Sequence, residues 1–263
     1  MCTVTVIPLQ NQKTGDAAGY RLACNRDELR ERAEAHPPGE FSFGNRLATY
    51  PVDPVSGGTW VALNDAGLAL VLLNVNPVTR VCELPDGFCV DTAIPVFADD
   101  RVITGSRGSI IPSLLHHTHA LDAAHQAAEM DPRGQMPFHL VCVDKRMIAD
   151  VRCDGDSFIF SQRPLNTGPV MFTSSGLGDS LVDSPRRKLF KDLFEYEFDA
   201  STQDTFHHHR WPEQGHLSVC MTRLDARTVS YTVIEAANEE FRLTYQPCPP
   251  EDAPSVTACY RGA

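Results

Sequence analysis

The chain has 263 residues, 42% hydrophobic and 22% charged, which is the balance of an ordinary globular protein. Its formal net charge of −11 argues against nucleic acid or an anionic membrane as a partner, because both attract basic surfaces. No apolar run approaches the roughly 20 residues that span a bilayer, and the start MCTVTVIPLQ lacks a signal-peptide layout, so we expect a cytoplasmic protein without membrane insertion.

Most of the chain has the pattern of short strands. β-Branched residues and turn signals predict strands over residues 2–7, 20–24, 59–63, 68–73, 138–143, 147–152, 157–161, 170–173, 217–222, 228–235 and 241–245. Helices are predicted over residues 106–115, 120–129 and 184–198, the last with Ser184 as N-cap and Pro185 at its first position. This order differs from the strict alternation of a doubly wound fold. We therefore expect an α+β fold of antiparallel sheets covered by helices, as a single domain over residues 1–263.

Cys2 stands apart from the other cysteines because of its place in the chain. The nine cysteines include no CxxC pair, and most are expected to be buried, reduced thiols. An initiator methionine is usually removed before a small residue, which would leave Cys2 with a thiol and a free α-amine. Because an α-amine has a pKa of about 7.7–8.0, part of it is neutral near pH 7 and can accept the thiol proton. Cys2 is thus either a self-contained nucleophile and base or simply the start of a strand.

A polar cluster, Asn25, Arg26, Asp27 and Glu28, directly follows the second predicted strand. One interpretation is a helix start, with Asn25 as N-cap and two acidic residues in the first turn. The other is a reactive strand end, where an arginine beside a carboxylate holds that carboxylate ionised. The residues alone leave both open.

The stretch GGTWVALNDAGLALVLLNVNP, residues 57–77, predicts a hairpin whose second strand ends near Asn74 and Asn76. An asparagine at a strand end can direct its amide at a developing oxyanion. The alternative is that both residues merely terminate the strand. Residues 36–53, which lie between this hairpin and the polar cluster, are expected to form the rim of a pocket.

Together these stretches resemble the NRDE family, whose eukaryotic members are called transport and Golgi organisation proteins. The likeness is carried by CNRDE after the second strand, by GGTW-x-x-x-N-x-x-G, and by a strand that ends in asparagine. It is strongest over residues 1–77 and continues into TSSGLGDSLVDSPRRKLF.

The family in turn resembles N-terminal-nucleophile hydrolases of the bile-salt hydrolase and penicillin V acylase group. Those enzymes share the Met-Cys start and a hairpin of the form L-N-x-x-G-L that ends in L-N-x-P. The resemblance implies a four-layer αββα sandwich of two stacked antiparallel sheets with outer helices. It also implies that Cys2 is the nucleophile, that Asp27 orients its amine beside Arg26, and that Asn74 stabilises the tetrahedral intermediate.

The sequence departs from the acylases at three positions. Their arginine three residues before the aspartate is Cys24 here, and Arg26 is adjacent to Asp27 instead. Their second oxyanion asparagine corresponds to Ser175, and their distal arginine to Arg223. The further candidates for contacts with substrate or oxyanion are Asn25, Glu28 and Asn76.

Two other stretches do not predict a site. The histidines of HHTH (116–119) and HHHRW (207–211) lack acidic or cysteine partners at a fitting interval, so we interpret them as solvated loop residues rather than metal ligands. The stretch TSSGLGDS (173–180) lacks the lysine and spacing of a P-loop and predicts a turn before a helix.

Two functions follow from these features. The first is an amide C–N hydrolase that uses Cys2 on a small linear amide or acyl conjugate, with no cofactor. The second is a non-catalytic carrier on the same fold, since the resemblance also links the family with haem movement and with lipid or acyl-coenzyme A metabolism; haem would then be a cargo. The substrate and the oligomeric state stay open.

Overall fold

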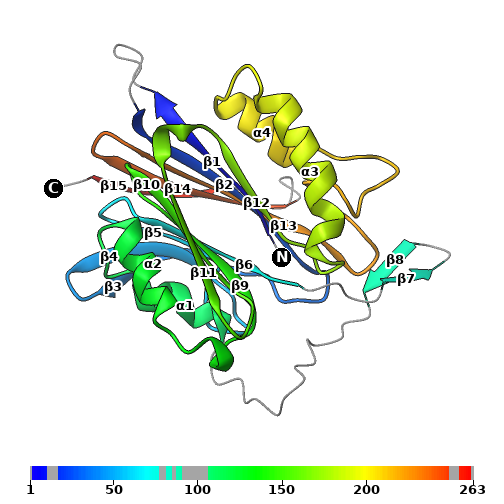
Figure 1. Cartoon of the computed structure of the whole chain (residues 1–263), viewed down its shortest axis with the longest axis horizontal. Coiled ribbons are helices and arrows are strands. Elements are labelled where there is room, and N and C mark those ends of the chain that lie inside the picture. Colours follow the sequence, from blue (N-terminus) through cyan, green and yellow to red (C-terminus); the bar gives the residue numbers. More distant parts are fainter. Residues whose placement is uncertain are drawn as a thin grey trace.

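Two antiparallel sheets lie at the centre of the fold (Figure 1). The computed structural model describes residues 2–10, 17–76, 81–84, 87–90, 106–248 and 255–261. The first sheet has the strand order β12 (Val170–Thr173), β1 (Cys2–Gln10), β2 (Ala17–Leu29), β13 (Ala226–Ala237), β14 (Glu240–Pro247), β15 (Val256–Arg261). The second has the order β11 (Phe158–Pro164), β10 (Met147–Cys153), β9 (Phe138–Val143), β6 (Ala69–Asn74), β5 (Val61–Asn64), β4 (Arg46–Val52), β3 (His36–Phe43). A separate pair is formed by β7 (Val81–Leu84) and β8 (Gly87–Val90).

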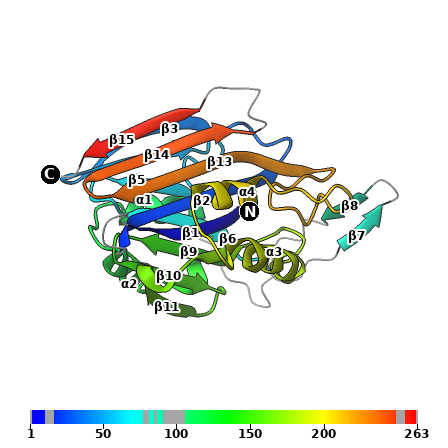
Figure 2. The same cartoon turned by 90° about the horizontal axis from the view of Figure 1, so that it is seen from above.

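Helices cover the outer face of each sheet. The second sheet is covered by α1 (Ile110–Leu114) and α2 (Ala120–Ala128), and the first by α3 (Asp179–Phe194) and α4 (Ala200–His208). Figure 1 shows the two helix pairs on opposite sides of the sheets, and Figure 2 shows β15, β14, β13, β2 and β1 side by side. Three short 3₁₀ helices connect elements: η1 (Arg107–Ser109), η2 (Pro132–Gly134) and η3 (Leu165–Thr167). The αββα sandwich expected from the sequence is confirmed.

The main core lies between the two sheets. Alternate residues of β1 and β2, such as Val4 and Leu22, meet Val71 of β6 and Val141 of β9 there, and all four are fully buried. Because successive residues of a strand point to opposite faces, the polar Thr3 and Thr5 face the outer helices instead. Within the described residues, no helix has the length and apolar character that crossing a membrane requires.

The strand β2 continues through the polar cluster that follows Cys24. It runs to Leu29, because β13 pairs with it from Gly19 opposite Ala237 to Leu29 opposite Ala226. The alternative of a helix that begins at Asn25 is therefore wrong. The side chains of the cluster alternate between the two faces of the first sheet.

The helix α3 begins earlier than expected. It starts at Asp179, so Ser184 is not the N-cap and Pro185 lies inside the helix. Asp179 ties the helix to the preceding turn, since its carboxylate accepts the Ser175 N–H at 2.9 Å. The proline leaves the carbonyl of Leu181 without its helical donor, and Leu181 is exposed, so water can replace that bond.

Several other elements differ from the sequence expectation. The segment 217–222 is an irregular buried loop rather than a strand, and the segment 195–198 lies outside α3. The elements that the sequence analysis missed are β3, β4, β7, β8, β15 and α4. Of these, β3 carries Pro37 and Pro38, which an edge strand tolerates because its outer N–H groups have no strand partner.

Candidate active site

Cys2 is the first residue of β1, and its side chain faces the space between the two sheets. It pairs with Arg26 of β2 and belongs to the inter-sheet core, with 2% of its surface exposed. It also lines a pocket of about 250 Å³. Its main-chain N–H donates to Ser174 Oγ at 3.2 Å, and its carbonyl accepts the Ser174 N–H at 2.9 Å. The backbone of Cys2 is therefore held by Ser174, directly after β12, while its thiol reaches the pocket.

The Cys2 thiol has a second thiol, that of Cys24, as its hydrogen-bond partner. A hydrogen bond with Cys24 lowers the pKa of Cys2, and the positive charges of the chain terminus and of Arg26 add to this effect. Burial and the charge of Asp27 oppose it. The same hydrogen bond and burial raise the pKa of Cys24. Cys24 therefore stays protonated and donates to the sulfur of Cys2, in the position where the acylases resembled by the sequence have an arginine.

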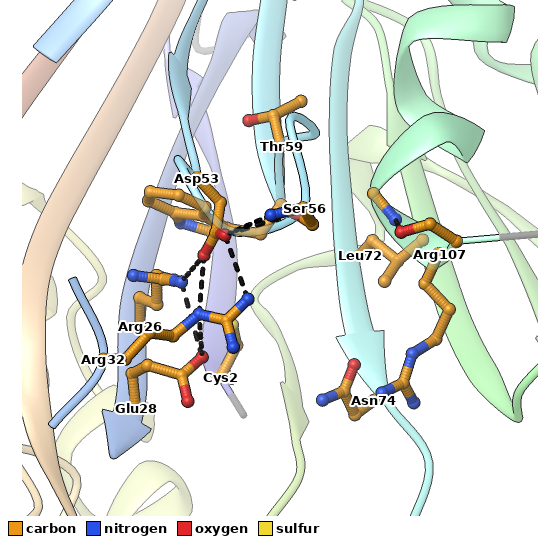
Figure 3. A pocket seen from close by; sticks show the side chains of 13 residues that line it. Cys2, Arg26, Glu28, Arg32, Asp53, Ser56, Thr59, Leu72, Asn74 and Arg107 are labelled. Atoms are coloured by element: carbon orange, nitrogen blue, oxygen red, sulfur yellow. Dashed lines mark hydrogen bonds and ion pairs between the residues drawn. The ribbon is translucent and has the colours of Figure 1, made fainter. Parts of the chain in front are cut away.

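One wall of the pocket is a network of charged residues (Figure 3). Arg26 forms a buried ion pair with Asp53 and a second ion pair with Glu28 at 3.3 Å. Arg32 donates to the same Asp53 carboxylate at 2.8 and 2.9 Å. The guanidinium of Arg26 also lies 4.2 Å from the ring centre of Trp60, a cation–π contact. Arg26 and Glu28 thus belong to the pocket, and their charges are paired.

The other wall carries Asn74, Arg107 and a few small side chains. Asn74 is the last residue of β6, and Figure 3 shows it with Arg107 across the pocket from Arg26 and Asp53. Arg107 lies in η1 and donates from Nη1 to the carbonyl of Pro137 at 3.0 Å. Cys2 and Asn74 therefore line one pocket, as the oxyanion hypothesis requires of them.

Asp27 faces the opposite side of the first sheet from Cys2. Thr228 Oγ1 donates to Asp27 Oδ1 at 2.6 Å, and the carboxylate is buried. Burial raises the pKa of Asp27, against the opposing charge of Arg186 and the bond from Thr228. A β-bulge at Val229 interrupts the pairing of β13 beside this residue. Asp27 is close enough to Cys2 to disfavour the thiolate, yet it does not line the pocket.

Two asparagines among the candidates serve the packing of helices instead. The Asn25 amide donates to the carbonyls of His207 and Val219 at 2.8 and 2.9 Å, so it holds α4 and a loop against the outer face of the sheet. The Asn76 N–H donates to Asp179 Oδ2 at 3.3 Å and anchors the start of α3. Neither residue lines the pocket of Cys2.

The two residues expected from the acylase comparison lie elsewhere. Ser175 caps the turn before α3, where its Oγ accepts the Leu177 N–H at 3.1 Å, and the hydroxyl beside Cys2 belongs to Ser174 instead. Arg223 forms an ion pair with Asp225 at 2.7 Å and acts on Asp27 from the outer face. The first departure arises because β12 ends at Thr173, so Ser174 and not Ser175 adjoins Cys2.

The interpretation of residues 207–211 as solvated is wrong for His207. It lies in α4 with 1% of its surface exposed, and its two ring nitrogens lie 2.8 Å from Thr5 Oγ1 and 3.1 Å from Asn25 Oδ1. Burial lowers the pKa of His207, so a neutral ring links α4 to the sheet. In the part of the chain that the structure describes, no group of three His, Cys, Asp or Glu side chains is arranged to hold a metal ion.

The pocket residues that the sequence analysis missed include Arg32, Asp53, Trp60 and Arg107. It also missed Ser174, which lies outside this pocket and holds the backbone of Cys2. Trp60 belongs to the GGTW motif, and Asp53 ends the stretch expected to form the rim. Both stretches were noted in the sequence, but neither of these two residues was given a role in the site. From the stretch 36–53, the residue that lines this pocket is Asp53. Nothing in the sequence brings Arg107 to the pocket, because it reaches it through the contact of two distant loops.

Comparison with solved structures confirms the fold. An N-acylethanolamine-hydrolyzing acid amidase ortholog from Caenorhabditis elegans superposes with a TM-score of 0.52 and 11% identity, over 88% of this chain and 92% of that one. Penicillin V acylase from Agrobacterium tumefaciens gives a TM-score of 0.48 and 12% identity, over 93% and 83% of the two chains.

No curated protein matches the sequence. The family model for Transport and Golgi organisation 2 matches residues 1–213. The matched residues include the motifs around Cys2, Asp27 and Asn74. The chain therefore belongs to the Transport and Golgi organisation 2 family.

Proposed function

We propose that this chain hydrolyses an amide C–N bond of a small molecule, with the Cys2 thiol as nucleophile. The observation that carries the proposal is that Cys2 begins β1 and presents a thiol of lowered pKa to a pocket that also contains Asn74. A structural cysteine at the start of a strand needs neither a pocket nor a partner that favours its thiolate. The fold shared with an amidase is consistent with this chemistry.

The reaction begins once Met1 has been removed and the Cys2 nitrogen is an amine. That amine accepts the thiol proton, and the thiolate attacks the carbonyl carbon of the amide. The tetrahedral intermediate collapses when the C–N bond breaks and the ammonium delivers its proton to the leaving nitrogen. Water, deprotonated by the same amine, then attacks the thioester and releases the acid and the free thiol.

Four groups assist these steps in the proposal. The Asn74 amide donates to the oxyanion, Asp27 orients the amine from the outer face of the sheet, and the charge of Arg26 favours the thiolate. Ser174, already hydrogen-bonded to the Cys2 nitrogen, fixes its position. Replacing the oxyanion donor, as in Asn74→Ala, should lower kcat by roughly 10²–10³ with little change in folding.

The experiment combines intact-mass analysis with an amide panel. A purified protein that lacks Met1 and hydrolyses a panel amide should lose turnover in Cys2→Ala and keep it in Cys259→Ala, which removes an exposed thiol on the edge strand β15. A protein that retains Met1, or an active Cys2→Ala variant, would refute the amine-assisted mechanism. Haem titration of wild type and Cys2→Ala tests the carrier alternative, which predicts binding that depends on Cys2 without turnover.

A further inference from the structure

The pocket beside Cys2 contains one guanidinium whose charge no described carboxylate neutralises. Of the five charged side chains that line it, Arg26 and Arg32 pair with Asp53, and Glu28 pairs with Arg26. Arg107 is the exception, since it has no ion pair with a carboxylate among the residues that the structure describes. Its hydrogen-bond partner is a neutral carbonyl, that of Pro137.

Arg107 is held in this position by the backbone. Gly58 and Gly108 approach so closely that a Cβ on Gly58 would lie 2.3 Å from the carbonyl oxygen of Gly108, and the Thr59 N–H donates to the same carbonyl at 3.2 Å. The bond to Pro137 then fixes one nitrogen of the guanidinium. A guanidinium carries five N–H donors, so the remaining donors of Arg107 are available to a ligand in the pocket.

Burial lowers the pKa of Arg107, and Glu28 is the charge that opposes this effect. Among the described residues, Arg107 has no carboxylate within ion-pair distance. A partly buried cation of this kind is stabilised by an anion that reaches it, and the attraction is stronger inside a pocket than in bulk water. The other members of this wall are Leu72 and the polar or small residues Asn74, Ser106 and Gly108, so that Leu72 is its one aliphatic side chain. Such a lining does not suit a long hydrocarbon chain.

We propose that the pocket takes small amides that carry an anionic group, a carboxylate or a phosphate, and that Arg107 binds this group while Cys2 attacks the amide. This inference rests on the proposed hydrolase function for the attack, but not for the binding of the anion. The pocket has a volume of about 250 Å³, enough for the reacting part of a small metabolite. Arg107 would thus determine specificity, and the paired Arg26 would not.

Alkylation of Cys2 tests the anion site without knowledge of the substrate. Iodoacetate and iodoacetamide differ in one charge, and the ratio of their rates at Cys2 is measured by peptide mass spectrometry. The exposed Cys259 of the same molecules gives the reference ratio. We expect the iodoacetate-to-iodoacetamide ratio at Cys2 to exceed that at Cys259 about tenfold, equivalent to about 1.4 kcal/mol of attraction.

Variants assign the effect to Arg107. Arg107→Gln should bring the Cys2 ratio to that of Cys259, Arg107→Lys should keep most of it, and Arg242→Gln, which removes an exposed charge on β14, should leave it unchanged. At constant ionic strength, protection of Cys2 by succinate assigns a carboxylate, and protection by inorganic phosphate assigns a phosphate. Equal ratios at Cys2 and Cys259 in the wild type, or no change in Arg107→Gln, would overturn the inference.

The two proposals fail in different ways. If Cys2 shows the raised ratio but no panel amide is turned over, the hydrolase function fails and the anion site stands. If amides are turned over but neutral and anionic members of the panel react equally well in wild type and Arg107→Gln, the anion site fails and the hydrolase function stands.

Discussion

Asp53 should contribute more to stability than any exposed carboxylate, because it holds together one wall of the pocket. It accepts hydrogen bonds from Arg26, from Arg32 at 2.8 and 2.9 Å, and from the N–H groups of Val55 and Ser56, both at 3.0 Å. The side chains of Asp53 and Arg26 are 5% and 7% exposed. The substitution Asp53→Asn keeps an oxygen for the backbone donors but removes the charge that neutralises both arginines.

The magnitude follows from the burial of each pair. Breaking a buried ion pair by removing one partner costs about 3–5 kcal/mol, because the other charge is left uncompensated. The pair with Arg32 is partly exposed and adds at most about 1 kcal/mol. Arg26 keeps Glu28 at 3.3 Å, which reduces the loss. We therefore expect Asp53→Asn to lower the free energy of unfolding by about 3 kcal/mol.

Urea unfolding followed by circular dichroism at pH 7 measures this loss. With an m value of about 2–3 kcal/mol/M, the midpoint should fall by about 1 M. The matched control is Asp65→Asn, which removes a more exposed carboxylate that pairs with Arg46 at 3.4 Å and should cost less than about 1 kcal/mol. If the two variants were equally stable, the reasoning about Asp53 would be refuted.

Three further results are expected. Burial alone would raise the pKa of Asp53, but the bonds from Arg32 and Ser56 lower it far below its ordinary value. The contribution of Asp53 to the free energy of unfolding is therefore complete above about pH 4 and is lost as the pH falls further. The acid-unfolding curves of wild type and Asp53→Asn should converge at low pH. Cys24→Ala should raise the pKa of Cys2, seen as a shift to higher pH in the rate profile of iodoacetamide alkylation at Cys2.

Arg186→Met should lower the free energy of unfolding by about 3 kcal/mol, because this buried arginine donates to two threonine hydroxyls and to the carbonyls of Leu217 and Ser218. Arg187→Met, at the next position but exposed, should cost less than about 1 kcal/mol in the same urea titration. A stability gap that persists at low pH, an unshifted alkylation profile, or equal losses at the two arginines would each contradict the corresponding expectation.

Antiparallel sheets covered by helices were predictable from the strand patterns, which are local signals, whereas the four-layer stacking was predicted by the resemblance of the motifs around Cys2. The faces of β2 were harder to predict. Asn25 and Asp27 point to the outer face and Arg26 to the pocket, and this depends on the strand continuing past Cys24, which the pairing with β13 determines. Polar residues at the end of a strand predict a turn or a helix start unless the neighbouring strand is known.

Long-range packing also explains what the sequence could not indicate about single residues. His207 is buried because α4 packs on β1 and β2, although its neighbours in sequence are also histidines and predict a solvated loop. Arg107 reaches the pocket because two glycines, 50 residues apart, allow their backbones to touch. Contacts of this kind leave no periodic pattern, so they appear in the structure first.

The first sheet separates the sulfur of Cys2 from part of the charge that acts on it. The sulfur lies on the side of Arg26 and the pocket, whereas the carboxylate of Asp27 and the charge of Arg186 act from the side of the outer helices. A change in the outer helices can therefore alter how reactive the cysteine is without reshaping the space where a molecule binds. Conversely, a change near Gly58 can alter the shape of the pocket and leave the reactivity of Cys2 intact. Pocket shape and cysteine reactivity can therefore vary independently among related chains.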